Sequence, residues 1–338
     1  MSTPDGRPGR GSGDGAGWDV ASASVIGSFH IREQLVNQDS VRTWVSDDGA
    51  SAVLAVADGH GHHLHFRSEV GAALATRCTL DVLTAMAESD PDLGPETAAA
   101  RIVERWLAAV ADHTQAEPFR PDQYVTDPLL PYGATLLAVL VTGSRLLALQ
   151  IGDGDTVAVH GSGEAFRPIP EDPSLDGIHT ASLCQPDPLS SFRFADIDLG
   201  DDPVRLVYLC TDGFGKARVD PVGWWRQTGE ELDRFTADRG AAWVAEQLPS
   251  WLAEPAEIGG DDTTLALASR RTAGTPSAAA PAPLPDTVDV PVPTPGAWDE
   301  PTDAHADNVT PTTSDRPATG AEAAPRPDEA DTLDVPYS

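Results

Sequence analysis

The segment from Ser51 to Gly61, SAVLAVADGHG, limits the possible folds of this chain more than any other stretch. Residues 52–57 are all apolar and show no polar alternation, so they predict a strand that is buried on both faces. The strand ends directly in Asp58 and Gly59. Because a carboxylate at the edge of an apolar core is costly unless a cation neutralises it, this strand end predicts a metal site.

Acidic residues stand at the ends of three more strand-like runs. LLALQIGDG brings Asp153 to such an end, LVYLCTDG brings Asp212, and the pair Asp261 and Asp262 precedes the apolar run TTLALA. Carboxylate oxygens are hard ligands that suit Mg²⁺ or Mn²⁺. A single Asp-Gly pair is more often an ordinary β-turn. Three such pairs beside a fourth acidic site instead favour a metal cluster.

The composition divides the chain into three parts. Residues 1–17 and 272–338 are rich in small, polar and proline residues and hold few large apolar side chains. Such segments cannot bury enough surface to offset their conformational entropy. We therefore expect a disordered N-terminus over 1–17, one folded domain over 18–271 and a disordered acidic tail over 272–338.

The charge and the cysteines exclude several classes of protein. The chain has 22 Lys and Arg against 53 Asp and Glu, a formal net charge of −31. Since phosphate contacts need clusters of Lys and Arg, we expect neither nucleic acid nor a membrane surface as a partner. We find no apolar run of transmembrane length and no apolar core of a signal peptide. Cys78, Cys184 and Cys210 form no CxxC pair, so we expect a cytoplasmic protein without a disulfide framework.

Apolar periodicity predicts an α+β fold. Helices are expected over 64–87, 96–117 and 220–253. Four β runs between 133 and 169 are joined by short links that cannot make parallel crossovers, which predicts an antiparallel meander. Further strands are expected over 192–198 and 204–210 as a pair and over 263–269 as the last strand. This order predicts two packed antiparallel β-sheets flanked by helices.

The predicted carboxylate cluster suits phosphoester hydrolysis. Two divalent ions that share such ligands can hold a water of lowered pKa and aim it at an electrophile. His60, two residues beyond Asp58, is the candidate general acid that protonates the departing alkoxide.

Six short motifs together resemble a known family, the metal-dependent Ser/Thr protein phosphatases (PPM, or type 2C), in its bacterial branch. They are NQD at 37–39, ADGHG at 57–61, GATL at 133–136, IGDG at 151–154, TDG at 211–213 and DDTT at 261–264. The resemblance covers essentially all of residues 22–269. It implies a β-sandwich flanked by helices, and hydrolysis of phosphoserine and phosphothreonine in proteins without a covalent intermediate.

The resemblance also implies roles for single residues. Two Mn²⁺ or Mg²⁺ ions would be bound, and phosphorylated proteins would be the substrates, with an opposing Ser/Thr kinase as a partner. Asp58 would bridge both ions, the Gly59 carbonyl would bind one ion, Asp212 and Asp261 would bind the other, Asp39 would act close to the ions, and Asp153 would reach a third, looser ion.

The chain departs from the family pattern at two positions. Many members carry a phosphate-binding Arg five residues before the aspartate of NQD, where this chain has Gln34. The nearby candidates for phosphate binding are His30 and Arg32, and the run GSFH resembles a bacterial branch with a His in this region. Four residues beyond the aspartate of TDG, where an acidic residue is often found, this chain has Lys216.

Two alternative functions remain open at this point. The run DGDTV that begins at Asp153 fits the DxDx(T/V) pattern of haloacid-dehalogenase-like phosphatases, in which the first aspartate is a covalent nucleophile. That motif normally lies early in a parallel sheet, which is not the arrangement predicted here. Gln34 and Lys216 also leave room for a non-catalytic metal-binding regulatory module, or pseudophosphatase.

Overall fold

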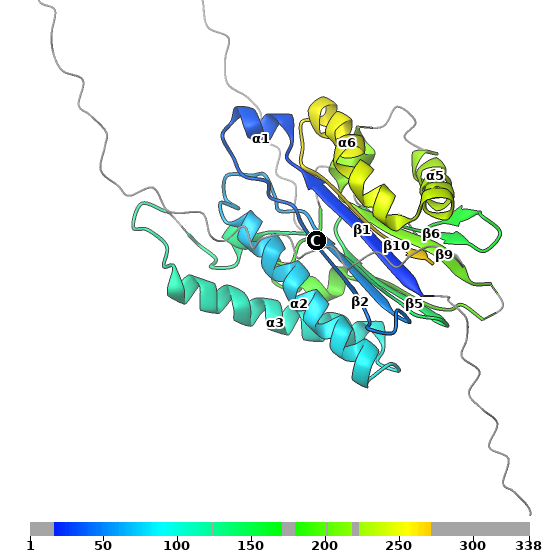
Figure 1. Ribbon diagram of the computed structural model, residues 1–338. Helices are drawn as coiled ribbons and strands as arrows, with labels where there is room; N and C mark the ends of the chain where they lie inside the picture. Colours follow the sequence, from blue (N-terminus) through cyan, green and yellow to red (C-terminus); the bar gives the residue numbers. More distant parts are fainter. Residues whose placement is uncertain (1–16, 124, 171–179, 201, 218–222, 272–338) are drawn as a thin grey trace, which may run out of the picture. The chain divides into compact units, whose positions relative to one another are not determined.

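The computed structural model describes residues 17–123, 125–170, 180–200, 202–217 and 223–271 (Figure 1). All of them belong to one compact unit, Met1–Asp289. The segments 1–16 and 272–338, which the composition predicts to be disordered, lie outside the described residues. At the two ends of the described chain, the Arg271 amide donates a hydrogen bond of 2.7 Å to the Gly17 carbonyl.

Two five-stranded antiparallel sheets form the centre of the domain, and we call them sheet A and sheet B. Sheet A has the order β1 (Trp18–Val25), β10 (Thr263–Arg270), β9 (Val204–Cys210), β6 (Asp155–His160) and β7 (Ala165–Phe166). Sheet B has the order β2 (Ser40–Val45), β3 (Ala52–Ala57), β4 (Leu136–Val141), β5 (Arg145–Ile151) and β8 (Arg193–Asp198).

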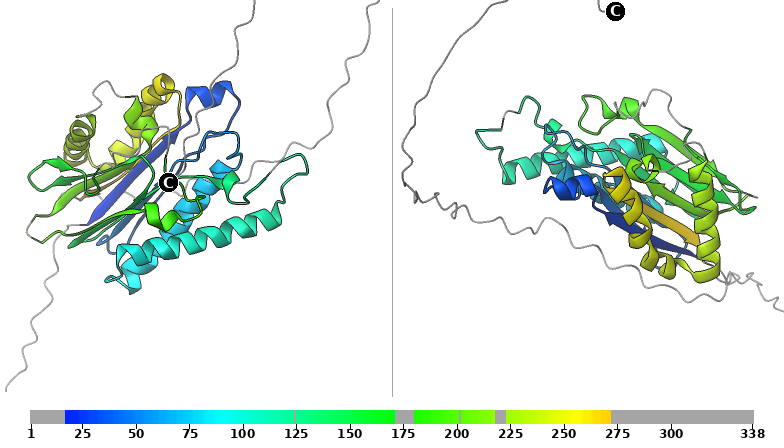
Figure 2. Two further views of the ribbon diagram at one scale, coloured as in Figure 1. Left: turned by 180° about the vertical axis from the view of Figure 1, so that it is seen from behind. Right: turned by 90° about the horizontal axis from the view of Figure 1, so that it is seen from above.

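Helices cover the outer faces of both sheets (Figures 1 and 2). The helices α2 (Ser68–Ser89) and α3 (Pro95–Ala116) pack on sheet B, and α5 (Trp224–Arg239) and α6 (Ala241–Gly259) pack on sheet A. The short elements are α1 (Ser28–Arg32), η1 (Leu130–Tyr132), η2 (Pro188–Ser191) and α4 (Asp212–Lys216). The predicted α+β sandwich of two antiparallel sheets between helices is therefore confirmed.

The apolar strand that opened the sequence argument lies at the centre of this arrangement. All six residues of β3 are buried, as predicted. Leu54 and Val56 face the core between the two sheets, whereas Val53 and Ala57 face the core between sheet B and its helices. The strand needs no polar alternation because both of its faces are covered.

The predicted antiparallel meander over 133–169 is wrong in one respect. Strands β4 and β5 pair, and β6 and β7 pair, but β5 lies in sheet B and β6 in sheet A. Strands β8 and β9, expected as a pair, also belong to different sheets. A short link is compatible both with a hairpin and with a passage from one sheet to the other, so link length alone could not separate the two. At the crossing after β5, Gly152 has a φ of +107°, a value that favours glycine.

Among the described helices, α2 alone is long and apolar enough, by length and composition, to cross a membrane. No run of this kind was expected from the sequence. The helix packs against β2, β3 and α3, and its residues Ala72, Leu83 and Met86 are buried there. The core of the domain therefore accounts for its apolar character.

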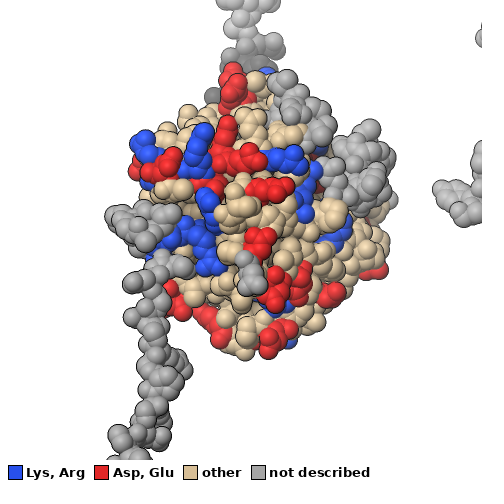
Figure 3. All heavy atoms as spheres, turned by 90° about the vertical axis from the view of Figure 1, so that its right-hand side faces the viewer, with Lys and Arg blue, Asp and Glu red and all other residues tan. Residues whose placement is uncertain are grey.

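One face of the molecule shows how its charges are distributed (Figure 3). Lys and Arg side chains lie there among many Asp and Glu side chains. The expectation that the protein does not bind nucleic acid stays a prediction.

Candidate active site

A cavity of about 690 Å³ opens where strands of both sheets end. Four of the predicted carboxylates line it, namely Asp58, Asp153, Asp212 and Asp261. The first two follow β3 and β5 of sheet B, and the other two adjoin β9 and β10 of sheet A. The packing of one sheet on the other therefore brings together acidic residues that are far apart in the sequence.

The ADGHG loop is held in place by the GATL segment. The Thr135 amide donates to the Asp58 carbonyl at 2.8 Å, and the Asp58 amide donates to Thr135 Oγ1 at 3.1 Å. Gly59 lies so close to its neighbours that an added Cβ would be 2.6 Å from the Gln38 carbonyl oxygen and 2.8 Å from that of Ser68. Only glycine fits there. The hydrogen bonds to Thr135 and the close packing of Gly59 together fix the ADGHG loop and so orient Asp58.

The TDG and DDTT motifs pack on each other in a similar way. Asp212 is the first residue of α4, and a Cβ on Gly213 would lie 2.1 Å from the Asp262 carbonyl oxygen. The Asp262 amide donates to Asp261 Oδ1 at 2.9 Å. This close contact sets Asp212 and Asp261 on the same side of the cavity.

The two remaining predicted ligands have specific partners. Asp39 does not line the cavity, and its Oδ2 accepts a hydrogen bond of 2.9 Å from Thr211 Oγ1. After burial and the charge of Asp212, the charge of Asp39 is a further cause of the raised pKa of Asp58, so the two carboxylates interact. Asp153 stands at the crossing between the sheets, and its Oδ1 accepts a hydrogen bond of 2.9 Å from Thr180 Oγ1.

The electrostatics of the site fit a divalent cation. Burial and the charge of Asp212 raise the pKa of Asp58 well above its usual value, and burial is also the main cause of the raised pKa values of Asp39 and Asp261. Asp212 Oδ1 is buried and has no hydrogen-bond partner among the described residues. A cation would satisfy this oxygen and favour the ionised carboxylates. In the described part of the chain, no three acidic, His or Cys side chains already form a group that could hold an ion.

Lys216 brings a positive charge into the same cavity. It follows Asp212 by four residues on α4, a spacing that places both side chains on one face of the helix. Its ammonium group contacts the Asp212 carboxylate and lies 3.8 Å from Asp153 Oδ2. Burial lowers the pKa of Lys216, but Asp212 and Asp153 outweigh burial and raise it. The lysine therefore acts as a tethered cation within the acidic cluster.

His60 lines the cavity, as expected of a residue that acts on the leaving group. Burial, with a smaller contribution from His65, lowers the pKa of His60 to about 4. A general acid has to carry its proton at the working pH, and an imidazole with this pKa is neutral near pH 7. The environment of His60 thus does not favour the predicted role, which stays a prediction.

The two candidates for phosphate binding point in different directions. His30 is 4% exposed and lines the cavity, whereas Arg32 is exposed and does not. Residues two apart on a helix lie on nearly opposite faces, so α1 can present only one of them to the site. Gln34, at the position of the usual family Arg, is also exposed and has a left-handed φ of +58°. Phosphate binding therefore stays a prediction, both for His30 and for Arg32.

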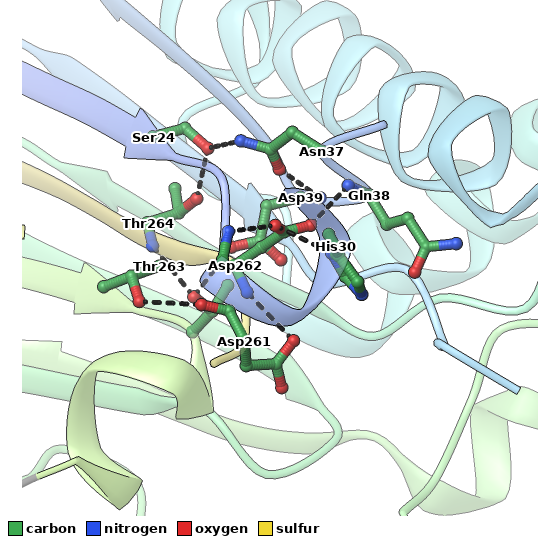
Figure 4. Close-up of polar contacts among 11 residues, drawn as sticks. Ser24, His30, Asn37, Gln38, Asp39, Asp261, Asp262, Thr263 and Thr264 are labelled. Atoms are coloured by element: carbon green, nitrogen blue, oxygen red, sulfur yellow. Dashed lines mark hydrogen bonds and ion pairs between the residues drawn. The ribbon is translucent and has the colours of Figure 1, made fainter. Parts of the chain in front are cut away.

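Asp262, to which the sequence patterns gave no role, lies at the centre of a polar network (Figure 4). This carboxylate is 2% exposed, and it accepts hydrogen bonds from the Gly27 amide at 2.7 Å and the Gln38 amide at 2.6 Å. Its Oδ1 also lies 2.8 Å from His30 Nδ1. The sequence held one signal for such a role: Asp261 and Asp262 are consecutive, and the predicted metal site used only Asp261.

Comparison with known proteins was consistent with these observations. A family model described as protein phosphatase 2C matches residues 26–253. A structure titled as the catalytic domain of the serine/threonine protein phosphatase PstP with two manganese ions is 21% identical, covers 75% of this chain and 98% of its own, and has a TM-score of 0.46. A variant of a bacterial serine phosphatase is 16% identical, with coverage of 74% and 97% and a TM-score of 0.50. A C. elegans sex-determining protein is 14% identical, with coverage of 75% and 65% and a TM-score of 0.51. No curated protein matched the chain.

Proposed function

The chain belongs to the protein phosphatase 2C family, and we propose that it hydrolyses phosphoserine and phosphothreonine in proteins with the help of Mn²⁺ or Mg²⁺. The observation that carries this proposal is the single cavity lined by Asp58, Asp153, Asp212 and Asp261, which come from both sheets. Four carboxylates in one cavity, of which Asp212 is buried and Asp58 and Asp153 are half-buried, are unfavourable without cations and favourable with them.

The residues of the cavity divide into those that hold ions and those that surround them. Bound divalent ions would supply a water of lowered pKa and neutralise the charge of the phosphoryl oxygens. Asp58, the Gly59 carbonyl, Asp212 and Asp261 would hold two ions, with Asp39 nearby and Asp153 available to a third, looser one.

A direct attack by water is favoured over a covalent intermediate on Asp153. This residue stands in a sandwich of antiparallel sheets, whereas the haloacid-dehalogenase-like motif belongs to a parallel sheet. Its Oδ1 accepts a hydrogen bond from Thr180, and its Oδ2 lies near the ammonium group of Lys216. Both contacts engage the carboxylate oxygens, one of which would have to attack the phosphorus in a covalent mechanism.

The biological setting is also part of this proposal. A phosphatase of this kind acts on phosphorylated proteins and opposes a Ser/Thr kinase, and we place it in the cytoplasm. These points rest on the family resemblance and on the acidic composition of the chain.

Hydrolysis by the purified full chain tests the proposal most directly. The rate on nitrophenyl phosphate and on a phosphothreonine peptide should depend on added Mn²⁺ and vanish with a chelator. Asp58→Asn should be inactive under every condition, which excludes a contaminating phosphatase. Binding of Mn²⁺ without any hydrolysis would instead favour the non-catalytic regulatory module that Gln34 and Lys216 leave open.

A further inference from the structure

We propose that Asp262 holds the His30 side chain so that Nε2 faces the cavity and binds a phosphate oxygen of the substrate. In this chain the carboxylate–imidazole pair would take the place of the arginine that many family members use. The inference rests on the proposed function, because it assigns the phosphate-binding part of that same site.

The contacts of Asp262 show why a histidine is held there. A carboxylate that is 2% exposed is costly unless it is paired and hydrogen-bonded. The Gly27 and Gln38 amides provide two hydrogen bonds, and His30 Nδ1 at 2.8 Å provides a partner that is cationic when the ring is protonated. In Figure 4 the Asp262 carboxylate lies between the DDTT segment, the His30 ring and the backbone of the NQD motif.

The same contact determines which ring nitrogen of His30 is left for a ligand. Nδ1 is occupied by Asp262, so only Nε2 can face the cavity that His30 lines. Gly61 lies beside Nε2: a Cβ added there would be 3.9 Å from this nitrogen, in van der Waals contact, so the glycine leaves this side of the ring uncovered. An aspartate that orients a histidine through Nδ1 is a known way to present the Nε2 atom. A protonated Nε2 can donate a charge-assisted hydrogen bond to a phosphate oxygen.

Other positive groups near the cavity are less suited to this task. Arg32 is exposed and outside the lining, and Lys216 already contacts Asp212 and lies near Asp153. The hydrogen bond to Asp262 raises the pKa of His30, which favours a protonated ring. The geometry and the charge of the pair therefore agree.

A simpler explanation is that Asp262 only ties the chain segments together. Its bonds to Gly27 and Gln38 do join the DDTT motif to the start of α1 and to the NQD motif. That function alone would not require His30 to reach the cavity. A double-mutant cycle separates the two roles, since a positioning residue acts on phosphate only through His30, whereas a structural tie acts without it.

The experiment measures binding of inorganic phosphate to the full chain in saturating Mg²⁺, by calorimetry and by NMR of the labelled histidine rings. His30→Gln should weaken phosphate binding by about tenfold or more, the loss expected for a hydrogen bond to a charged group. Asp262→Asn should cause a similar loss in the wild-type background and little further loss when combined with His30→Gln. It should lower the melting temperature in both backgrounds, because the two backbone amides lose part of their acceptor.

Two further variants guard against trivial effects. His30→Arg keeps a cation beside Asp262 and should bind phosphate more tightly than His30→Gln. His63→Gln, at an exposed position outside the cavity lining, should match the wild type. In the wild type, the Nε2 resonance of His30 should move on addition of phosphate.

Unchanged phosphate affinity in His30→Gln would overturn the proposal, as would equal affinities of His30→Gln and His30→Arg. Equal losses of phosphate affinity on Asp262→Asn with and without His30→Gln would also overturn it, because Asp262 would then be only a structural tie. Because phosphate binding is measured without turnover, a chain that binds phosphate through His30 but hydrolyses nothing would contradict the proposed function and leave this inference standing.

Discussion

The ammonium nitrogen of Lys216 lies 3.8 Å from Oδ2 of Asp153 while it also contacts the carboxylate of Asp212. Lys216 thus links Asp153, where the chain crosses between the sheets, to Asp212 at the start of α4. At an effective dielectric near 20, two unit charges at such a distance interact by about 4 kcal/mol, and exposure of the lysine to solvent reduces this value. The remaining attraction reduces the repulsion between the carboxylates of Asp153 and Asp212. Without the lysine, an additional metal ion could take over this task.

We therefore predict that Lys216 lowers the affinity for a further Mn²⁺ ion. Lys216→Asp should add a low-affinity step to a calorimetric Mn²⁺ titration, and Lys216→Ala should do so to a smaller extent. Lys216→Arg keeps the charge and should behave like the wild type. Identical stoichiometry and affinity in all variants would mean that the lysine has no influence on the ions.

The proposed ligands differ in how much activity should depend on them. Asp58 is central to the cluster, and its pKa responds to Asp212, Asp39, Asp261 and Asp153. Asp58→Asn should abolish turnover at every Mn²⁺ concentration, whereas Asp153→Asn should leave measurable activity with a higher Mn²⁺ requirement. Steady-state rates over a range of Mn²⁺ concentrations test this difference. A phospho-enzyme trapped on Asp153 would instead support the covalent mechanism.

Without metal, the acidic cluster should destabilise the domain at neutral pH. Because the folded-state pKa of Asp58 lies above its value in the unfolded chain, its contribution to stability is fully present at low pH and is lost as the pH rises through the folded-state pKa. In a chelator, Asp58→Asn should raise the melting temperature by at least about 2 °C at pH 7.5, the shift that 1 kcal/mol produces in a domain of this size. The gain should shrink on acidification.

Calorimetric scans between pH 5 and pH 8 measure this effect on the metal-free protein. Asp112→Asn removes an exposed aspartate of α3 and serves as the matched control, for which no such gain is expected. Adding Mn²⁺ should stabilise the wild type more than Asp58→Asn. A gain that does not vary with pH would show that repulsion among the carboxylates is not its cause.

The low pKa of His60, about 4, predicts how a variant at this position behaves. A neutral imidazole gives little help to a leaving alkoxide, so His60→Gln should slow hydrolysis of phosphothreonine peptide and nitrophenyl phosphate by the same factor. The ratio of kcat/KM values on the two substrates is the measurement. A much larger loss on phosphothreonine, whose leaving group needs a proton, would restore His60 as the general acid.

The same pKa predicts a stability effect with the opposite sign to that of Asp58. Between about pH 4 and pH 6.5 the unfolded chain takes up a proton at His60 that the folded protein does not, so stability falls as the pH drops through this window. His60→Gln should therefore lose less stability than the wild type when the metal-free protein is taken from pH 7 to pH 5. Equal losses in both proteins would show that His60 titrates normally in the folded state.

Several features of this protein could be predicted from the sequence alone, because their causes are local. An apolar run such as β3 must be covered on both faces, and an Asp-Gly pair directly after it places a carboxylate at the edge of the core. The α+β fold of two sheets between helices followed from the number and order of such runs, and the predicted helices over 64–87 and 96–117 correspond to α2 and α3. The motifs also indicated the family that the match over residues 26–253 then showed.

The tertiary structure decided what depends on contacts between distant segments. Link lengths did not reveal that β5 and β6 belong to different sheets, because a short turn can lead along one sheet or across to the other. Gly27 and Asp262 are 235 positions apart, yet the packing of the start of α1 on the loop between α6 and β10 brings the Gly27 amide within 2.7 Å of the Asp262 side chain. The orientation of His30 follows from that contact. The sequence thus determined which chemical groups this protein has at its strand ends, and the packing of the two sheets determined which of these groups meet.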